Sequence, residues 1–300
     1  MLTADPASPT DAVGLEELVD EPTRRRRIGA GRTLAGAWLA AVVLGALLVA
    51  WLPLAEGSDP SKALDEPVAA RPDLLSGHPL GTDRQGLDLL SQVLEGARVS
   101  LTIGLAAVGL AALVGGAMGI LAGYLRGRWE QVVQILTDSL LAFPPLILLL
   151  AIVTALDPSI ASIAGALGLV VLPTYARLAR AATLRLSQQE FILAAQACGA
   201  SRTRILWREI APSVVVPIVS YSFVVAAALI VAEASLSFLG LGIQRPTPTW
   251  GNMIAAGQVD FQRDPHLVAV PGLVLFLTVF ALNQVGEGLR HRLDPRESHL

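Results

Sequence analysis

Long apolar runs separated by polar segments give this chain its pattern. A helix needs roughly 20 apolar residues to cross the hydrocarbon core of a bilayer, and most of the runs approach or reach that length with at most one charge inside them. One run, at 160–175, is shorter and contains Pro173. We therefore predict an all-α membrane protein with about six transmembrane helices, at residues 34–54, 99–125, 132–156, 160–175, 214–232 and 267–285.

The basic residues predict how these spans are oriented, because cytoplasmic loops of membrane proteins carry an excess of Lys and Arg. With six spans, sixteen of the 22 basic residues share a side with both termini, and six lie on the other side. We therefore expect both termini in the cytoplasm. The six basic residues on the other, extracytoplasmic side are Lys62, Arg71, Arg84, Arg98, Arg245 and Arg263.

The same pattern divides the chain into segments. We expect a disordered cytoplasmic tail at 1–32, a first transmembrane helix at 33–55, an extracytoplasmic loop at 56–97, a membrane domain at 98–287 and a cytoplasmic tail at 288–300. Arginines precede the first span, so a cleaved signal peptide is the alternative for it. The run is longer than a usual signal sequence and no small-x-small cleavage site follows it, which favours a retained span.

Composition supports a membrane location and argues against several functions. Hydrophobic residues make up 53% and charged residues 16% of the chain, whereas soluble domains carry about 25% charged residues. The net charge of −3 gives no reason to expect nucleic acid. Cys198 is the single cysteine, and the single lysine, Lys62, follows Ser61, so it cannot complete a phosphate-binding loop. We expect no catalytic site, metal or cofactor in this chain.

Two features of the outer loop and the second span have structural interpretations. The stretch 81–90 resembles a turn that leads into a helix capped by Thr82 or Asp83. Gly115, Gly119 and Gly123 repeat every four residues and lie on one helical face, where they would allow another helix to approach closely. The alternative for the glycines is simple tolerance in a membrane helix.

The segment 176–212 is basic and long for a connection between two spans. We predict one helix over 176–198, ended by Gly199 in the left-handed conformation. Ala194, Ala195 and Ala197 give the end of this helix a small surface. Such a surface suits a groove in another protein, although an ordinary solvated helix fits the residues equally well.

Ionisable residues within the spans are few. Asp138 lies in the third predicted span and Glu233 at the outer end of the fifth. Carboxylates in a bilayer usually face a protein interior or water, so a structural role and a role in a solute pathway both remain open. Ser235 and Ser237 follow in a Gly/Pro-rich stretch that we expect to be a broken element at the outer mouth.

The segment 193–212 resembles the cytoplasmic loop of permease subunits in ATP-binding-cassette (ABC) importers, whose pattern is E-A-A-x3-G-x9-I-x-L-P. Ala194, Ala195, Gly199 and Pro212 match this pattern. The chain departs from it at three positions, with Leu193 for the acid, Glu209 for the isoleucine and Ala211 for the leucine.

Further segments resemble the dipeptide, oligopeptide and nickel group of these permeases, and within it the C-type subunit. The resemblance runs from about 32 to 296. The segments include G-T-D-R-Q-G-L-D-L-L-S at 81–91, G-A-R-V-S-L at 96–101, A-Q-A-C-G-A-S at 195–201, E-A-S-L-S-F-L-G-L-G at 233–242 and L-D-P-R at 293–296.

The resemblance implies a type I ABC importer permease fold over 98–287, with a coupling loop at 176–212. It implies that 188–201, including Ala200 and Ser201, forms a helix that docks on an ATPase subunit. It also implies a B-type permease, two cytoplasmic ATPases that bind ATP and Mg²⁺, and an extracytoplasmic substrate-binding protein. We expect peptides as substrates, with nickel or another small solute as the alternative. A stand-alone channel or secondary carrier would predict intramembrane charge networks or inverted repeats, and the sequence shows neither.

Overall fold

The computed structural model describes residues 22–293 apart from 53, 55 and 74–76, and every regular element in those residues is a helix. The predicted tails at 1–21 and 294–300 lie outside the described residues. The elements are α1 (Pro22–Leu48), η1 (Val49–Trp51), η2 (Pro60–Lys62), α2 (Leu89–Leu110), η3 (Ala111–Gly115), α3 (Gly116–Leu125), α4 (Arg128–Leu141), α5 (Pro145–Ala155), α6 (Ile160–Leu186), α7 (Glu190–Ala197), α8 (Arg202–Ile205), η4 (Leu206–Ile210), α9 (Ala211–Phe238), α10 (Trp250–Gly257), η5 (Gln258–Asp260) and α11 (His266–Leu293).

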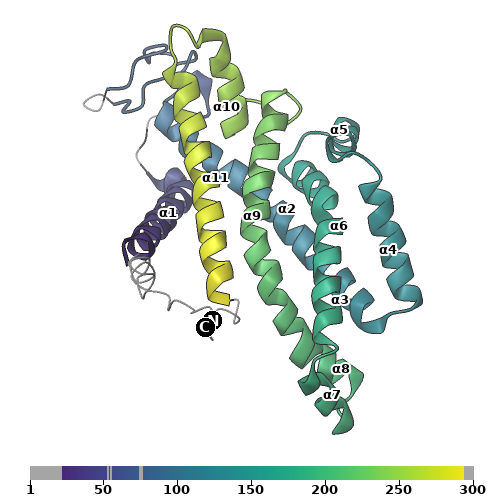
Figure 1. Ribbon diagram of the computed structural model, residues 1–300. Coiled ribbons are helices and arrows are strands. Elements are labelled where there is room, and N and C mark those ends of the chain that lie inside the picture. The colour runs from purple at the N-terminus through teal and green to yellow at the C-terminus, as the bar shows by residue number, and fades with distance from the viewer. Residues whose placement is uncertain (1–21, 53, 55, 74–76, 294–300) are drawn as a thin grey trace, which may run out of the picture.

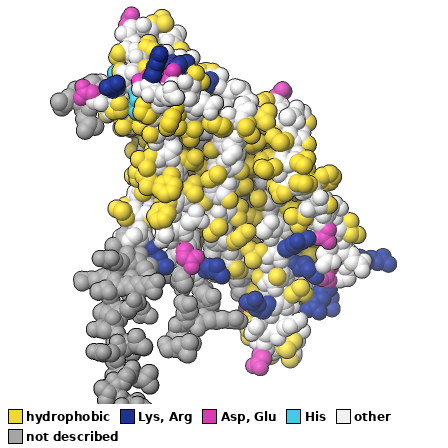
Figure 2. Space-filling model, turned by 45° about the horizontal axis from the view of Figure 1, so that its top comes forward, with side chains coloured by type: hydrophobic (Ala, Val, Ile, Leu, Met, Phe, Trp, Pro, Cys, Tyr) yellow, Lys and Arg dark blue, Asp and Glu magenta, His cyan; other side chains and the backbone are white. Residues whose placement is uncertain are grey.

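Helices α6, α9 and α11 run along the length of the molecule, α1 lies beside α11 at an angle to it, and the continuous helix formed by α2, η3 and α3 crosses behind the long helices (Figure 1). Helices α7 and α8 lie at one end, which we call the α7 end. Helices α10 and α5 and the segment 56–88 lie at the opposite end, which we call the α10 end. Apolar side chains cover the middle of the surface and charged side chains gather towards the two ends (Figure 2), as expected of a protein embedded in a bilayer.

Among the described residues, five helices are long and apolar enough to cross a membrane, and six spans result if the bent pair α4 and α5 counts as one. This agrees with the predicted number. The prediction of one regular helix over 132–156 is wrong, because α4 ends at Leu141, α5 begins at Pro145 and the two meet at 86°. Pro144 and Pro145 cause the break, since proline lacks a backbone N–H and clashes with a preceding helical turn.

Three other predicted boundaries are also wrong. Helix α6 extends past 175 to Leu186 with Pro173 inside it, and the predicted helix over 176–198 is interrupted at 187–189. Helix α9 continues through Glu233 to Phe238, where we expected a broken element. The irregular backbone begins only near Gly240, whose φ of 77° requires a residue without a Cβ.

The described residues of the segment 56–88 fold over the N-terminus of α2 at the α10 end. Asp88, and not Thr82 or Asp83, caps α2, with its Oδ2 accepting from the backbone N–H of Ser91 at 2.8 Å. Asp83 instead shapes the preceding turn, because its Oδ1 accepts from the N–H groups of Gln85 and Leu87 at 2.8 and 3.0 Å. The turn thus has its own acceptor and leaves Asp88 available to begin the helix.

Candidate functional site

Helix α7 forms a short projection at the α7 end, and one side of it is anchored. Ile192 on α7 is fully buried, as is Ile210 after α8, and Ile205 on α8 is 1% exposed. The hydroxyl of Tyr124 at the end of α3 donates to the carbonyl oxygen of Arg202 at 2.9 Å. These contacts hold the projection against the long helices and explain why the chain turns at 187–189, since the turn directs Ile192 into the core.

The outward side of α7 carries the small residues that the sequence singled out. Leu193, Ala194 and Gly199 are exposed, and Leu193 is 53% exposed. Ala195 and Ala200 face partly inward and pack against the core. The structure therefore divides the predicted coupling residues into an outward set and a supporting set.

The end of α7 is fixed by its backbone. Gly199 has a φ of 80°, which is the left-handed conformation that the sequence predicted. The N–H of Ala200 donates to the carbonyl of Ala195 at 3.0 Å, which closes the helix end. Ser201 then caps α8, with its hydroxyl oxygen accepting from the N–H of Arg204 at 3.4 Å. Pro212 lies in the first turn of α9, beyond η4 and apart from the exposed side of α7.

The three spaced glycines lie against α6. A Cβ at Gly119 would come within 2.2 Å of the carbonyl oxygen of Ala176, and one at Gly115 within 2.6 Å of the carbonyl oxygen of Leu172. A Cβ at Gly123 would lie 2.9 Å from the Cβ of Thr183. The backbones of α3 and α6 therefore approach more closely than any side chain at these positions would allow.

The two intramembrane carboxylates have different surroundings. Asp138 is exposed on α4 and accepts from the guanidinium of Arg177 on α6 at 2.6 Å. Glu233 is fully buried, and its two oxygens accept from the hydroxyls of Ser100 at 2.9 Å and Ser237 at 2.7 Å. Glu233 thus links α9 to α2. Ser235 is exposed and its hydroxyl donates to the carbonyl of Val231 on its own helix.

The α10 helix is locked beside Glu233. Trp250 is fully buried and its indole Nε1–H donates to the carbonyl of Val93 on α2 at 3.1 Å. Thr249 and Asn252 form a capping box at the start of α10, and the Asn252 amide also donates to the carbonyl of Ile243 at 3.1 Å. Helices α2, α9 and α10 are therefore joined by buried polar contacts at this end.

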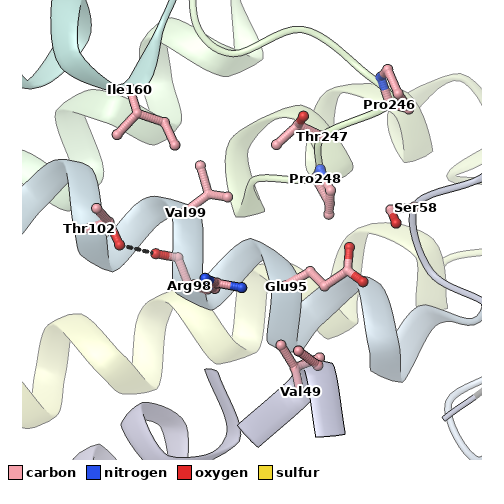
Figure 3. A pocket seen from close by; sticks show the side chains of 11 residues that line it. Val49, Ser58, Glu95, Arg98, Val99, Thr102, Ile160, Pro246, Thr247 and Pro248 are labelled. Atoms are coloured by element: carbon pink, nitrogen blue, oxygen red, sulfur yellow. Dashed lines mark hydrogen bonds between the residues drawn. The ribbon is translucent and has the colours of Figure 1, made fainter. Parts of the chain in front are cut away.

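A cavity of about 610 Å³ opens at the α10 end between the end of α1, the first turns of α2, the start of α6 and the loop after α9 (Figure 3). Glu95 and Arg98 of α2 line it with Ser58 and Thr247. The sequence pattern did not predict a site at these residues. Arg98 was named for its charge and within the segment 96–101, but residues from five separate segments cannot be brought together by spacing alone.

Comparison with known proteins places this architecture in a family. Residues 115–299 match the family described as the binding-protein-dependent transport system inner membrane component. The glutathione transport system permease protein GsiD of Escherichia coli O6:K15:H31 (strain 536 / UPEC) is 43% identical over 219 residues, covering 73% of this chain and 72% of that protein. The di/tripeptide transport system permease protein DppC of Pseudomonas aeruginosa (strain UCBPP-PA14) is 36% identical over 259 residues, covering 85% of this chain and 84% of that protein.

Among solved structures, the chain is similar to one from the inward-facing MetNI methionine ABC transporter. The TM-score is 0.53 with 15% sequence identity, over 68% of this chain and 96% of that chain. This likeness supports the fold that the sequence resemblance implied. The chain belongs to the family of binding-protein-dependent transport system inner membrane components and is a permease subunit of an ABC importer.

Proposed function

We propose that this chain forms half of the translocation pathway of an importer of di- or oligopeptides. The similarity to permeases whose names specify glutathione and di/tripeptides supports peptides as the solute class. A B-type permease would supply the other half, and an extracytoplasmic binding protein would deliver the peptide. This chain would bind no cofactor itself and catalyse no reaction, because ATP and Mg²⁺ would be held by two partner ATPases.

The α7 helix would couple the permease to those ATPases. The observation that carries this proposal is its combination of an exposed small surface, at Ala194 and Gly199, with rigid anchoring through buried Ile192 and Ile205. A force applied to the exposed side reaches the long helices only if the helix cannot move independently of them. Leu193 replaces the acid of the family pattern, so docking here would depend on shape more than on charge.

We also propose that the α7 end faces the cytoplasm, together with both chain termini. The distribution of basic residues supports this orientation, since exposed arginines gather around the α7 end, among them Arg126, Arg128, Arg185, Arg202 and Arg204. In this orientation the ATPases would meet α7 and the binding protein would meet the α10 end.

Replacing Ala194 with tryptophan tests the coupling role. Uptake of a radiolabelled dipeptide into membrane vesicles supplied with ATP should fall to near background, while the subunit still reaches the membrane. ATP hydrolysis should no longer respond to the loaded binding protein. Ala181 is an exposed alanine on α6 near the same end, and Ala181→Trp is the matched control that should transport normally. Full uptake by the Ala194→Trp variant would contradict the coupling assignment.

Cys198 offers an independent test of contact. It is exposed and is the single cysteine of the chain, and it lies between Ala194 and Gly199 on the proposed docking surface. A short bifunctional thiol reagent should therefore join it to a cysteine on the partner ATPase without any engineered site in this subunit. Absence of the cross-linked product in a transporter that hydrolyses ATP would argue against docking at α7.

A further inference from the structure

The cavity at the α10 end has the size and lining of a small-molecule site. Binding pockets for small ligands span about 300–1,000 Å³ and combine apolar walls with a few polar groups. This cavity measures about 610 Å³, and Val49, Val99, Ile160 and Pro248 supply apolar walls. Glu233, the buried carboxylate that the sequence emphasised, does not line it and is saturated by Ser100 and Ser237.

Two opposite charges face this cavity from one helix. Glu95 and Arg98 are three residues apart on α2, a spacing that puts their Cβ atoms about 5–6 Å apart on one face. Figure 3 shows both side chains at the edge of the cavity, with no hydrogen bond drawn between them. Among the described residues, Arg98 has no ion-pair partner within 4.0 Å. The guanidinium acts electrostatically on the neighbouring Glu95 carboxylate, but Arg98 is exposed, so an anion can reach it.

A second carboxylate, that of Glu56, lies near Glu95. The hydroxyl of Ser58 lies beside the Glu95 carboxylate (Figure 3) and donates to Glu56 at 3.2 Å. Glu56 is itself close enough to Glu95 to act on it electrostatically. Glu95 and Arg98 thus present a carboxylate and a guanidinium side by side on one face of α2, which is an arrangement that attracts a molecule with a cation at one end and an anion at the other.

We propose that this cavity binds a small zwitterion, with Glu95 holding the ammonium group and Arg98 the carboxylate of a short peptide. The inference rests on the proposed function in naming a peptide as the zwitterion. The apolar walls would accept side chains without selecting among them, because they offer few hydrogen-bonding groups. Recognition of the two termini would make the site selective for short peptides with free ends and tolerant of their sequence.

The test measures protection of a cysteine in the cavity. Thr247 lines the cavity and is exposed, so Thr247→Cys in a Cys198→Ser background gives one reactive thiol. The full chain is placed in phospholipid nanodiscs, and the rate of maleimide labelling is followed as L-alanyl-L-alanine is added. Labelling should slow in a saturable manner. N-acetyl-alanyl-alanine and alanyl-alanine amide, which each lack one charge, should protect about tenfold more weakly or less, as expected for the loss of one charge-assisted hydrogen bond.

Variants assign each terminus. Glu95→Gln should weaken protection by the free dipeptide at least tenfold but leave the weak protection by the N-acetylated peptide unchanged. Arg98→Gln should likewise weaken protection by the free dipeptide at least tenfold, and it should leave the weak protection by the amidated peptide unchanged. Arg263→Gln removes an exposed arginine at the same end and outside the cavity. The free dipeptide should protect the cysteine in this variant as well as it does in the parent. Equal protection by free and blocked peptides, or no effect of either substitution, would overturn the proposal.

A lipid headgroup is the other zwitterion that could occupy the cavity. Repeating the labelling in nanodiscs with and without phosphatidylethanolamine separates the two, and protection that follows the lipid but ignores the dipeptide would also overturn the proposal. Failure of this inference is distinct from failure of the proposed function. Peptide uptake that persists without protection would contradict the site alone, whereas protection without uptake in the assembled transporter would contradict the import function alone.

Discussion

The contact between α3 and α6 predicts a large effect from a very small change. In Gly119→Ala the added Cβ would lie 2.2 Å from the carbonyl oxygen of Ala176, 2.8 Å from the Cβ of Ala179 and 2.9 Å from the backbone nitrogen of Arg180. Ordinary contact begins at 3.4 Å, so α3 and α6 must part by about 1.2 Å. The obstacle is backbone, which cannot rotate out of the way as a side chain can.

The free energy of unfolding should fall accordingly. Overpacking of a close contact costs about 1–3 kcal/mol, and a backbone obstacle belongs at the upper end of that range. Alanine recovers about 0.8–1.0 kcal/mol through its higher helix propensity. The net loss is therefore about 2 kcal/mol. Gly109 lies on the same continuous helix, and a Cβ added there would meet nothing within 4 Å, so Gly109→Ala should show only the gain of about 1 kcal/mol.

Thermal unfolding of the detergent-solubilised chain measures this difference. A change of 1 kcal/mol moves the unfolding midpoint by roughly 2–4 °C in a chain of comparable size, so the two variants should differ by about 6–12 °C. Loss of the monodisperse peak in size-exclusion chromatography after heating is a suitable signal. If Gly119→Ala unfolds within about 1–2 °C of Gly109→Ala, close backbone packing does not stabilise this contact and the reasoning is refuted.

The neighbouring glycines give a ranking that a general loss of flexibility would not produce. A Cβ at Gly115 meets the carbonyl of Leu172 at 2.6 Å, whereas one at Gly123 first meets the side chain of Thr183 at 2.9 Å. The carbonyl oxygen of Arg180 follows at 3.0 Å, so the overlap at Gly123 is the smallest of the three. We therefore expect destabilisation in the order Gly119→Ala, Gly115→Ala, Gly123→Ala, from largest to smallest, and the reverse order would contradict the geometry.

Three further predictions concern the polar groups. Glu233→Ala leaves two buried hydroxyls without their acceptor and opens a cavity, so it should lower the free energy of unfolding by about 2–4 kcal/mol. Glu233→Gln keeps the volume of the side chain and should lower the free energy of unfolding by less. Loss of uptake by the Gln variant with normal stability would instead indicate a role in the pathway. Asp138→Asn should change the midpoint by less than about 4 °C, because the pair with Arg177 is more than half exposed and such pairs contribute up to about 1 kcal/mol. Burial of the His78 ring lowers its pKa, but hydrogen bonds to Glu66 at 2.9 Å and Asp88 at 3.1 Å outweigh burial and raise the pKa above the ordinary value of 6.5. Because the folded-state pKa is raised, the stabilisation by His78 is complete below about pH 6.5 and is lost as the pH rises through the folded-state pKa. Hydrogen exchange at the start of α2 should therefore accelerate with rising pH by more than the intrinsic increase in the exchange rate. His78→Gln should abolish this additional acceleration.

The number of spans and the packing positions could be predicted because each depends on local sequence. Apolar length determines whether a helix can cross the bilayer, and the spacing of Gly115, Gly119 and Gly123 determines that they share a face. Gly199 was predictable for a similar reason, since the left-handed conformation at a helix end selects glycine. None of these inferences requires knowledge of which helices are neighbours.

The errors arose where tertiary contacts or a local breaker overruled average hydropathy. The run 132–156 is predominantly apolar, yet Pro144 and Pro145 end one helix and begin another, and this signal was present in the sequence. The turn at 187–189 contains neither glycine nor proline, and burial of Ile192 explains it only once the fold is known. The cavity near Glu95 and Arg98 could not be predicted, because its walls come from segments far apart in the chain.

The distribution of close contacts indicates how this permease would move. Helix α6 is held to α3 by backbone contact at Gly115 and Gly119, and α9 is held to α2 by the buried Glu233. Separating α9 from α2 would leave the buried Glu233 without its hydrogen bond from Ser100, and separating α6 from α3 would lose the van der Waals contacts of closely packed backbones. A force on α7, which leads from α6 into α9, would therefore displace these helices together as one body. The movement that opens one end of the pathway and closes the other must then displace this whole bundle relative to another subunit, and not its helices relative to one another. Under this argument a disulfide that joins α3 to α6 should leave transport intact, while one that joins α7 to the partner ATPase should stop it.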